Sequence, residues 1–197
     1  MTESYPEEQE KLDRMYMERA LELAEKGRGT TTPNPMVGAV IVKEGRIIGE
    51  GYHIRAGEGH AEVNAFKNAT EDVAGATMYV TLEPCSHYGK TPPCADKIIE
   101  KGIGRVVVAA MDPNPLVAGR GVQKIRDAGI PVTTGILAEK SIQLNEIFMK
   151  YIVTEKPFVM LKAAMSLDGK IATSTGESQW ISCEASREEV HRLRHEL

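Results

Sequence analysis

At 197 residues the chain can form one domain of typical size and little more. Hydrophobic residues make up 42% and charged residues 26%, as in ordinary globular proteins. The net charge of −4 argues against a nucleic-acid partner, which usually requires a basic surface. No apolar run approaches the roughly 20 residues that span a bilayer, and the acidic N-terminus is not a secretory signal. We expect a cytoplasmic protein without a nucleic-acid or membrane partner.

The first elements in the chain are a helix and a hairpin. Residues 8–26 carry apolar side chains at helical spacing, and Gly27 and Gly29 end the pattern. Two strand-like runs, 36–42 and 46–52, are joined by a short connection containing Gly45, which is typical of a β-hairpin.

Helices and strands then alternate as far as residue 153. The pattern predicts helices at 60–69, at about 93–102, up to residue 128 and at 138–153, and strands at 76–82, 105–110 and 130–134. Short helices between strands imply crossover connections and a partly parallel sheet with helices on its faces. With the hairpin, the fold class is α/β, a mixed β-sheet sandwiched between helices.

A second unit begins after residue 156. Residues 157–165 are strand-like, 166–178 are rich in turn residues, and 183–196 have helical spacing. One strand and one helix are too few to build a separate core. We therefore expect a domain at 1–153 and a partial C-terminal α/β segment at 157–197.

Two cysteines and a histidine form a candidate zinc site. Three cysteines in the chain, with no secretory signal, argue against a disulfide framework. His60, Cys85 and Cys94 offer donors that zinc accepts, and three protein ligands leave a fourth position for water, as in catalytic sites. Two alternatives remain: a structural zinc site closed by His87, or buried thiols without a metal.

A carboxylate stands next to these ligands in the sequence. Glu62 lies two residues after His60, close enough to reach the water without binding the metal. Zinc lowers the pKa of a bound water to about 7, and Glu62 would move its protons as a general acid–base. The order His-x-Glu followed by Pro-Cys is the signature of zinc-dependent deaminases. On its own, Glu62 could equally be a solvated residue at a helix start.

The connection between the two cysteines is long. Base and nucleoside deaminases commonly have two residues there, whereas this chain has eight, Ser86 to Pro93. The inserted loop contains His87 and Lys90 and can reach over a substrate. Lysine is a common phosphate ligand.

Four stretches of the sequence resemble a known family. They are Thr32-Pro33-Asn34-Pro35-Met36-Val37-Gly38, His60-Ala61-Glu62-Val63, Thr81 to Cys94, and Asp112-Pro113-Asn114-Pro115 with Gly119-Arg120-Gly121. They resemble the bifunctional riboflavin-biosynthesis deaminase/reductase family. The resemblance implies a cytidine-deaminase-like fold and hydrolysis of the 2-amino group of 2,5-diamino-6-ribosylamino-4(3H)-pyrimidinone 5′-phosphate, a small pyrimidine ribotide.

The resemblance also implies roles for individual residues. It makes His60, Cys85 and Cys94 the ligands of Zn²⁺ and Glu62 the proton shuttle. It places six side chains around the substrate, with Lys90 and Asn114 nearest the phosphate: Asn34, His53, His87, Lys90, Asp112 and Asn114. Simpler explanations exist, because asparagine is favoured in Asn-Pro turns on backbone grounds and His53 could be an exposed residue at a strand end.

The likeness continues into the reductase half of that family. It implies that Ala164 and Trp180 contact NADPH and that Ser178 and Arg194 contact the ribose phosphate. The family's reductase domain runs on for about as long again as the sequence shown here. We therefore expect a poorly ordered, readily proteolysed tail, no NADPH-dependent reduction unless the domain is complete, and no function for Cys183.

Other functions stay open at this point. The chain could deaminate a free base, another nucleotide or a tRNA adenosine, although its acidic balance weighs against tRNA and the long cysteine loop against the others. It could also be a zinc-stabilised interaction module, in which Glu62 has no chemical role. Domains of this kind often pair with a copy of themselves, so we expect a homo-oligomer.

Overall fold

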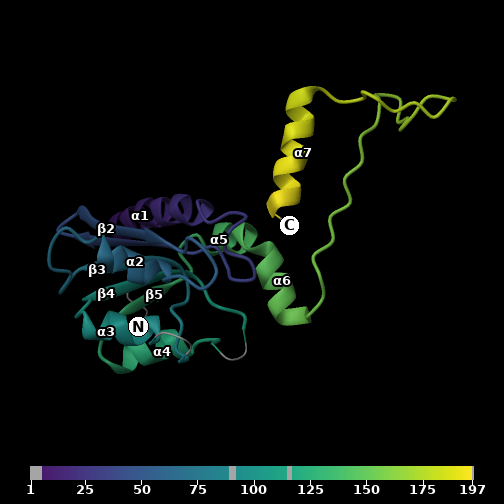
Figure 1. The fold of residues 1–197 in the computed structure, drawn as a ribbon. Helices are drawn as coiled ribbons and strands as arrows, with labels where there is room; N and C mark the ends of the chain where they lie inside the picture. The colour runs from purple at the N-terminus through teal and green to yellow at the C-terminus, as the bar shows by residue number, and fades with distance from the viewer. Residues whose placement is uncertain (1–5, 89–91, 115–116, 197) are drawn as a thin grey trace.

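The computed structural model describes residues 6–88, 92–114 and 117–196 and has a single five-stranded sheet within them, in the order β2-β1-β3-β4-β5 (Figure 1). In chain order the elements are α1 (Glu7–Glu25), β1 (Gly38–Lys43), β2 (Arg46–Tyr52), α2 (Ala61–Lys67), β3 (Thr77–Leu82), α3 (Cys94–Glu100), β4 (Arg105–Ala110), α4 (Arg120–Asp127), β5 (Val132–Thr134), α5 (Ala138–Leu144), α6 (Glu146–Thr154) and α7 (Glu184–Glu196).

The sheet is mixed, as predicted. β1 pairs antiparallel with β2 and β3, whereas β3, β4 and β5 are parallel. Helices α3 and α4 provide the crossovers between the parallel strands. Because β3 and β4 run in the same direction, the loops that follow them meet at one edge of the sheet. Those loops contain the predicted site residues Cys85, His87, Asp112 and Asn114.

The predicted hairpin is confirmed. Its turn places Glu44 at φ 51° and Gly45 at φ 75°, so both central residues are left-handed. This is the backbone of a type I′ turn, whose twist matches that of the flanking strands. Gly45 adopts such a φ without steric cost, and the turn fixes the register from Lys43 opposite Arg46.

Helices cover both faces of the sheet, so the strands are apolar on both sides. One face packs against α2, α3 and α4 through Ile41, Met78, Val80, Val106 and Val108. The other face packs against α1 and α5 through Val40, Val42, Tyr79, Val107 and Ala109. This alternation along each strand is the period-2 pattern of β-structure.

One buried ionic group ties α1 to the sheet. Asp13 is completely buried and accepts hydrogen bonds from Arg105 at 3.0 and 2.6 Å and from the Tyr79 hydroxyl at 2.7 Å. A bidentate Arg–carboxylate pair satisfies the charge that burial would otherwise penalise. The group lies on the α1 side of the sheet, on the N-terminal half of β3 and β4.

The prediction of one helix over 138–153 is wrong in one respect, because the structure has two helices. α5 ends at Leu144 and α6 begins at Glu146, and Asn145 between them has φ −108° and ψ 23°. Asparagine side chains compete with the helical backbone for hydrogen bonds. Here the Asn145 amide turns inward to bond residues near β1, and the helix axis changes direction.

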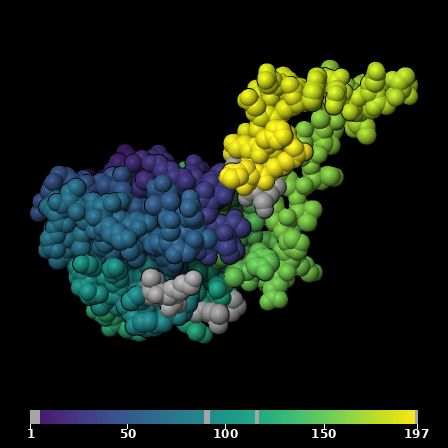
Figure 2. Space-filling model, in the orientation of Figure 1, coloured from purple at the N-terminus to yellow at the C-terminus, as the bar shows by residue number. Residues whose placement is uncertain are grey.

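The C-terminal segment extends away from the sheet (Figures 1 and 2). Residues 155–183, all of which the structure describes, form neither helix nor strand, so the strand predicted at 157–165 is absent. A strand needs a partner for its backbone groups, and this segment has none in the sheet. Several apolar side chains are exposed, among them Leu161 at 93% and Trp180 at 69%. The helix predicted at 183–196 is confirmed as α7.

Within the described ranges, none of the helices combines the length and the apolar character that crossing a membrane would require.

Candidate active site

Three predicted metal ligands, separated in the sequence, meet at the edge of the sheet. His60 is the N-cap of α2, Cys85 lies in the turn after β3, and Cys94 is the first residue of α3. The ligand atoms of the three side chains all lie within 4.8 Å of one another. His60 Nδ1 lies 3.5 Å from Cys85 Sγ and 3.3 Å from Cys94 Sγ.

This geometry fits a zinc ion. With Zn–S near 2.3 Å and Zn–N near 2.0–2.1 Å, a tetrahedral site separates a sulfur from a nitrogen ligand by about 3.6 Å. The two observed nitrogen–sulfur distances, 3.5 and 3.3 Å, are close to that value. One imidazole and two thiols are also a donor set that zinc accepts.

The alternative of a structural site closed by His87 finds no support in the geometry. Among the described residues the cluster has three members, and His87 is an exposed residue outside it. Three protein ligands leave one coordination position open, which is the arrangement of catalytic zinc sites. Lys90, the other predicted residue of this loop, lies outside the described residues.

The pKa values of the two thiols are shifted in opposite directions. Hydrogen bonding from Cys94 lowers the pKa of Cys85 to about 4, an effect that burial opposes and His60 reinforces. Hydrogen bonding to Cys85 and burial raise the pKa of Cys94 well above its ordinary value. One cysteine is therefore already held as a thiolate, the form in which cysteine binds metals.

Glu62 lies beside the ligands without belonging to their cluster. It is the second residue of α2 and only 3% exposed. Burial raises its pKa, and the charge of Cys85 adds to this effect. The carboxyl group is thus enclosed at the metal site, so the reading of Glu62 as a solvated helix-start residue is wrong.

A second carboxylate, Glu83, was not singled out in the sequence. It lies directly after β3, is 4% exposed, and accepts four backbone N–H groups. Its Oε1 accepts Gly121 at 2.9 Å and Val122 at 3.2 Å, and its Oε2 accepts Gly119 at 2.9 Å and Asp112 at 3.3 Å. A carboxylate is stabilised there because the N-terminus of α4 presents free N–H groups and a positive dipole end.

Glycine is required where α4 meets this turn. A Cβ on Gly121 would lie 1.9 Å from the Pro84 carbonyl oxygen, so any larger residue would displace the helix. The close approach explains how Glu83 reaches the N–H groups of α4. Sequence reasoning could have singled out this pair, because Gly121 and the acidic Glu83 both belong to the stretches that resemble the known family.

Asn34 and His53 are brought together, as predicted for a common pocket. Asn34 Nδ2 lies 3.1 Å from His53 Nε2, and His53 Nδ1 lies 3.2 Å from the Gly59 carbonyl oxygen. His53 is buried, and burial lowers its pKa, which favours the neutral ring. Nδ1 then donates to Gly59 and Nε2 accepts from Asn34. The expectation that His53 could be exposed is wrong, because its ring stands edge-on to His60 at 5.7 Å.

Asp112 and Asn114 occupy the loop after β4. Asp112 Oδ1 accepts the Asn114 N–H at 2.9 Å, which closes a short turn. Burial raises the pKa of Asp112, and the charges of Glu83 and Cys85 act in the same direction, whereas His87 lowers it. The Asp112 N–H donates to Glu83 Oε2 at 3.3 Å, which places Asp112 close to the cysteine turn. Both residues are half-buried, at the edge where β3 and β4 end.

The four predicted reductase contacts lie outside this site. Ala164, Ser178 and Trp180 are in the extended segment, and Arg194 is on α7. Trp180 stacks on Arg187 at 4.2 Å. None of the four lines a cavity of about 610 Å³ near the Asn34 loop.

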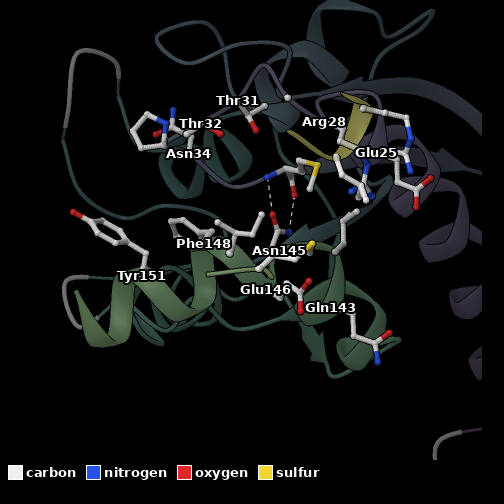
Figure 3. A pocket seen from close by; sticks show the side chains of 18 residues that line it. Glu25, Arg28, Thr31, Thr32, Asn34, Gln143, Asn145, Glu146, Phe148 and Tyr151 are labelled. Atoms are coloured by element: carbon white, nitrogen blue, oxygen red, sulfur yellow. Dashed lines mark hydrogen bonds between the residues drawn. The ribbon is translucent and has the colours of Figure 1, made fainter. Parts of the chain in front are cut away.

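That cavity lies between the Asn34 loop, α6 and the end of α7 (Figure 3). Asn34 is its link to the predicted substrate residues, whereas the three ligands and Glu62 are not part of its lining. It is therefore a neighbour of the metal cluster and not its entrance.

Comparison with known proteins now defines the class. Residues 10–110 match the family described as the cytidine and deoxycytidylate deaminase zinc-binding region. The chain belongs to this family, and the predicted cytidine-deaminase-like fold is confirmed. Residues 157–197 match a second family, the RibD C-terminal domain.

The particular resemblance is to riboflavin biosynthesis protein RibD. The Aquifex aeolicus protein of that name is 57% identical over 185 residues, which is 94% of this chain and 52% of the relative. The crystal structure of a Thermotoga maritima diaminohydroxyphosphoribosylaminopyrimidine deaminase/5-amino-6-(5-phosphoribosylamino)uracil reductase has 51% identity and a TM-score of 0.90, over 94% of this chain and 54% of that one. The predicted resemblance is thus confirmed, and the chain spans about half the length of these relatives.

A shorter relative is similar to the first domain alone. The Aspergillus oryzae Rib2 deaminase, a C-terminal deletion mutant solved in complex with DARIPP, is 27% identical with a TM-score of 0.56. The alignment covers 71% of this chain and 93% of that one.

The first prediction concerns zinc content. Purified protein should contain about one zinc per chain, and Cys85→Ser should lose it, because a serine hydroxyl is a poor replacement for a thiolate ligand. Elemental analysis measures both. Cys183→Ser, which removes the exposed thiol of the tail, is the matched control and should keep its zinc. Equal zinc in the Cys85 and Cys183 variants would contradict the assigned ligand set.

The second prediction concerns Glu83. Glu83→Gln keeps the shape but turns an NH₂ group toward backbone N–H donors, and we expect it to lower the free energy of unfolding by about 2–4 kcal/mol. Urea denaturation of the zinc-loaded protein measures the change. Glu18→Gln, which breaks an exposed ion pair with Lys140, is the control and should change stability little. A Glu83 variant as stable as the control would show that the four N–H groups do not depend on its charge.

Proposed function

We propose that residues 1–153 catalyse the hydrolytic deamination of 2,5-diamino-6-ribosylamino-4(3H)-pyrimidinone 5′-phosphate to 5-amino-6-(5-phosphoribosylamino)uracil. The observation that carries the proposal is the cluster of His60, Cys85 and Cys94, with the buried carboxyl of Glu62 beside it. The similarity to RibD supports the choice of substrate.

His60, Cys85 and Cys94 would hold the zinc, which supplies Lewis-acid chemistry that makes water a nucleophile near neutral pH. Glu62 accepts a proton from the attacking water and passes it to the ring nitrogen. It then takes the remaining hydroxyl proton of the adduct and passes it to the amino group, which leaves as ammonia while the ring carbon becomes a carbonyl. The enclosed position of Glu62 keeps these protons away from bulk solvent.

The substrate would lie between the two sides of the site. On one side, Asn34 and His53 form a hydrogen-bonded pair beside His60. On the other side, Asp112 and Asn114 follow β4. We assign the phosphate to Lys90, with Asn114 near it, and His87 to the rim of the same loop.

We further propose that the chain divides into a deaminase domain at 1–153 and the start of an NADPH-dependent reductase domain at 157–197. The match of the second segment to the RibD C-terminal domain supports this division. In a complete domain, Ala164 and Trp180 would contact NADPH, and Ser178 and Arg194 the ribose phosphate. The exposed positions of Ser178, Trp180 and Arg194 in the present structure agree with a pocket built from further strands.

The third prediction tests the reaction and its proton carrier. Zinc-loaded protein should deaminate the diaminopyrimidinone ribotide and leave cytidine and guanine unchanged, as followed by ammonia release. Glu62→Gln should keep its zinc and lose about 10²–10⁴-fold or more in kcat, because the amide cannot carry the proton. Glu100→Gln, at the exposed end of α3, is the control and should keep full turnover.

Three results would contradict the proposal. Turnover of cytidine or guanine in preference to the ribotide would show a deaminase of another substrate. Near-full turnover in Glu62→Gln would remove the assigned proton carrier, and a zinc-loaded wild-type protein without any turnover would indicate an interaction module.

The fourth prediction concerns the phosphate. Lys90→Ala should raise KM for the ribotide by roughly ten- to a hundredfold, since a charge-assisted contact contributes about 1.5–3 kcal/mol. KM for the dephosphorylated substrate should rise much less. Lys101→Ala, an exposed lysine at the end of α3, should affect neither. Equal losses on the two substrates would show that Lys90 shapes the loop and that another group binds the phosphate.

A further inference from the structure

Asn145 makes an unusual set of hydrogen bonds at the break between α5 and α6. Its side chain is 3% exposed, and its amide bonds both backbone groups of one residue, Met36 (Figure 3). The Met36 N–H donates to Asn145 Oδ1 at 2.7 Å, and Asn145 Nδ2 donates to the Met36 carbonyl at 2.9 Å. The side chain thus pairs with Met36 as a neighbouring strand would, just before β1 begins.

Met36 belongs to the segment that presents Asn34 to the site. On the opposite side the same segment is held by His53, whose N–H donates to the Val37 carbonyl at 2.9 Å. Asn34 Nδ2 also lies 3.1 Å from His53 Nε2. The segment 34–37 is therefore fixed between His53 and Asn145.

Helix α5 anchors Asn145 to the strand that leads to the metal turn. Ser141 Oγ donates to the Thr81 carbonyl of β3 at 2.6 Å, and the Asn145 N–H donates to the Ser141 carbonyl at 3.2 Å. Thr81 lies four residues before Cys85. A continuous set of hydrogen bonds consequently runs from β3, through α5, to the Asn34 segment.

We propose that Asn145 is a positioning residue for the deaminase site, one that sets the place of Asn34 relative to His53 and the metal ligands. This role rests on the proposed function, because it assigns Asn34 to the substrate. Asn145 does not touch the substrate itself. It acts through its hydrogen bonds to Met36. Helix α6, which begins directly after Asn145, buries none of its side chains.

The chemistry of the amide explains why asparagine is needed. Pairing with both backbone groups of Met36 takes one donor and one acceptor on a short side chain. Aspartate keeps the acceptor but sets a second oxygen against the carbonyls of Met36 and Ser141, which Nδ2 now approaches at 2.9 and 3.3 Å. Alanine removes both bonds and leaves the N–H and the carbonyl of the half-buried Met36 without this partner.

The experiment compares kinetics with stability in the zinc-loaded chain. Asn145→Ala and Asn145→Asp should raise KM for the ribotide about tenfold, because misplaced binding groups lose affinity. Zinc content should be unchanged, and kcat should change less than KM. The Asp variant keeps the size of the side chain, so the test holds if the Ala variant does not fold.

Tyr79→Phe is the matched control for loss of a buried hydrogen bond. It removes the 2.7 Å bond to Asp13 on the α1 side of the sheet. It should lower the thermal midpoint and leave KM unchanged. Asn145 variants that behave like this control, less stable but with wild-type KM, would overturn the positioning role.

A double-mutant cycle tests the route through Asn34. If Asn145 acts by placing Asn34, then Asn145→Ala should raise KM no further in an Asn34→Ala background. Additive effects would overturn the proposal. Unchanged KM in the Asn145 variants of an active protein rejects the positioning role alone. A wild-type protein that does not deaminate the ribotide rejects the proposed function, and the positioning role with it.

Discussion

The Glu83 carboxylate is the interaction on which the site depends. It gathers four backbone N–H groups from the loop after β4 and from the N-terminus of α4. Since Glu83 is two residues from Cys85, the same side chain fixes one metal ligand and the loop that carries Asp112. Buried charges are tolerated only when fully hydrogen-bonded. This requirement leaves little freedom for the turn, and it accounts for the close contact between Gly121 and Pro84.

The site is built from two halves of the sheet with opposite strand directions. Parallel β3 and β4 deliver the cysteine turn and the Asp112 loop, whereas the antiparallel β1–β2 hairpin delivers Asn34 and His53. His60 at the start of α2 joins the halves, because its Nδ1 contacts both sulfurs and its ring packs on His53. Asn145 links the halves a second time, from the other side of the Asn34 segment.

The C-terminal segment differs from the sheet domain in how its apolar side chains are packed. Its apolar side chains, such as Leu161 and Leu167, are exposed rather than packed, and its strand-like stretch lacks a pairing partner. Exposed apolar surface of this kind marks a region that packs against something else. Residues 157–197, which contain this segment, match the RibD C-terminal domain.

The sequence by itself determined the features that depend on local patterns. The hairpin at Gly45, the alternation of strands and helices, and the set His60, Glu62, Cys85 and Cys94 all follow from residue spacing and turn chemistry. Their assembly into one cluster was predictable because a known signature fixes their order. The sequence could not show that the strand predicted at 157–165 does not form. Period-2 spacing indicates a strand but does not supply a partner strand for it to pair with.

Only the tertiary structure decided which distant groups pair. Glu83 and Gly121 are 38 residues apart, and Met36 and Asn145 are 109 apart. The presence of a glutamate or an asparagine does not predict such a backbone partner, because the partner depends on strand order and helix packing. The same holds for the break of the predicted helix at Asn145 and for the burial of His53. Long-range hydrogen bonds to the backbone are satisfied by position in the fold, and residue type alone does not encode that position.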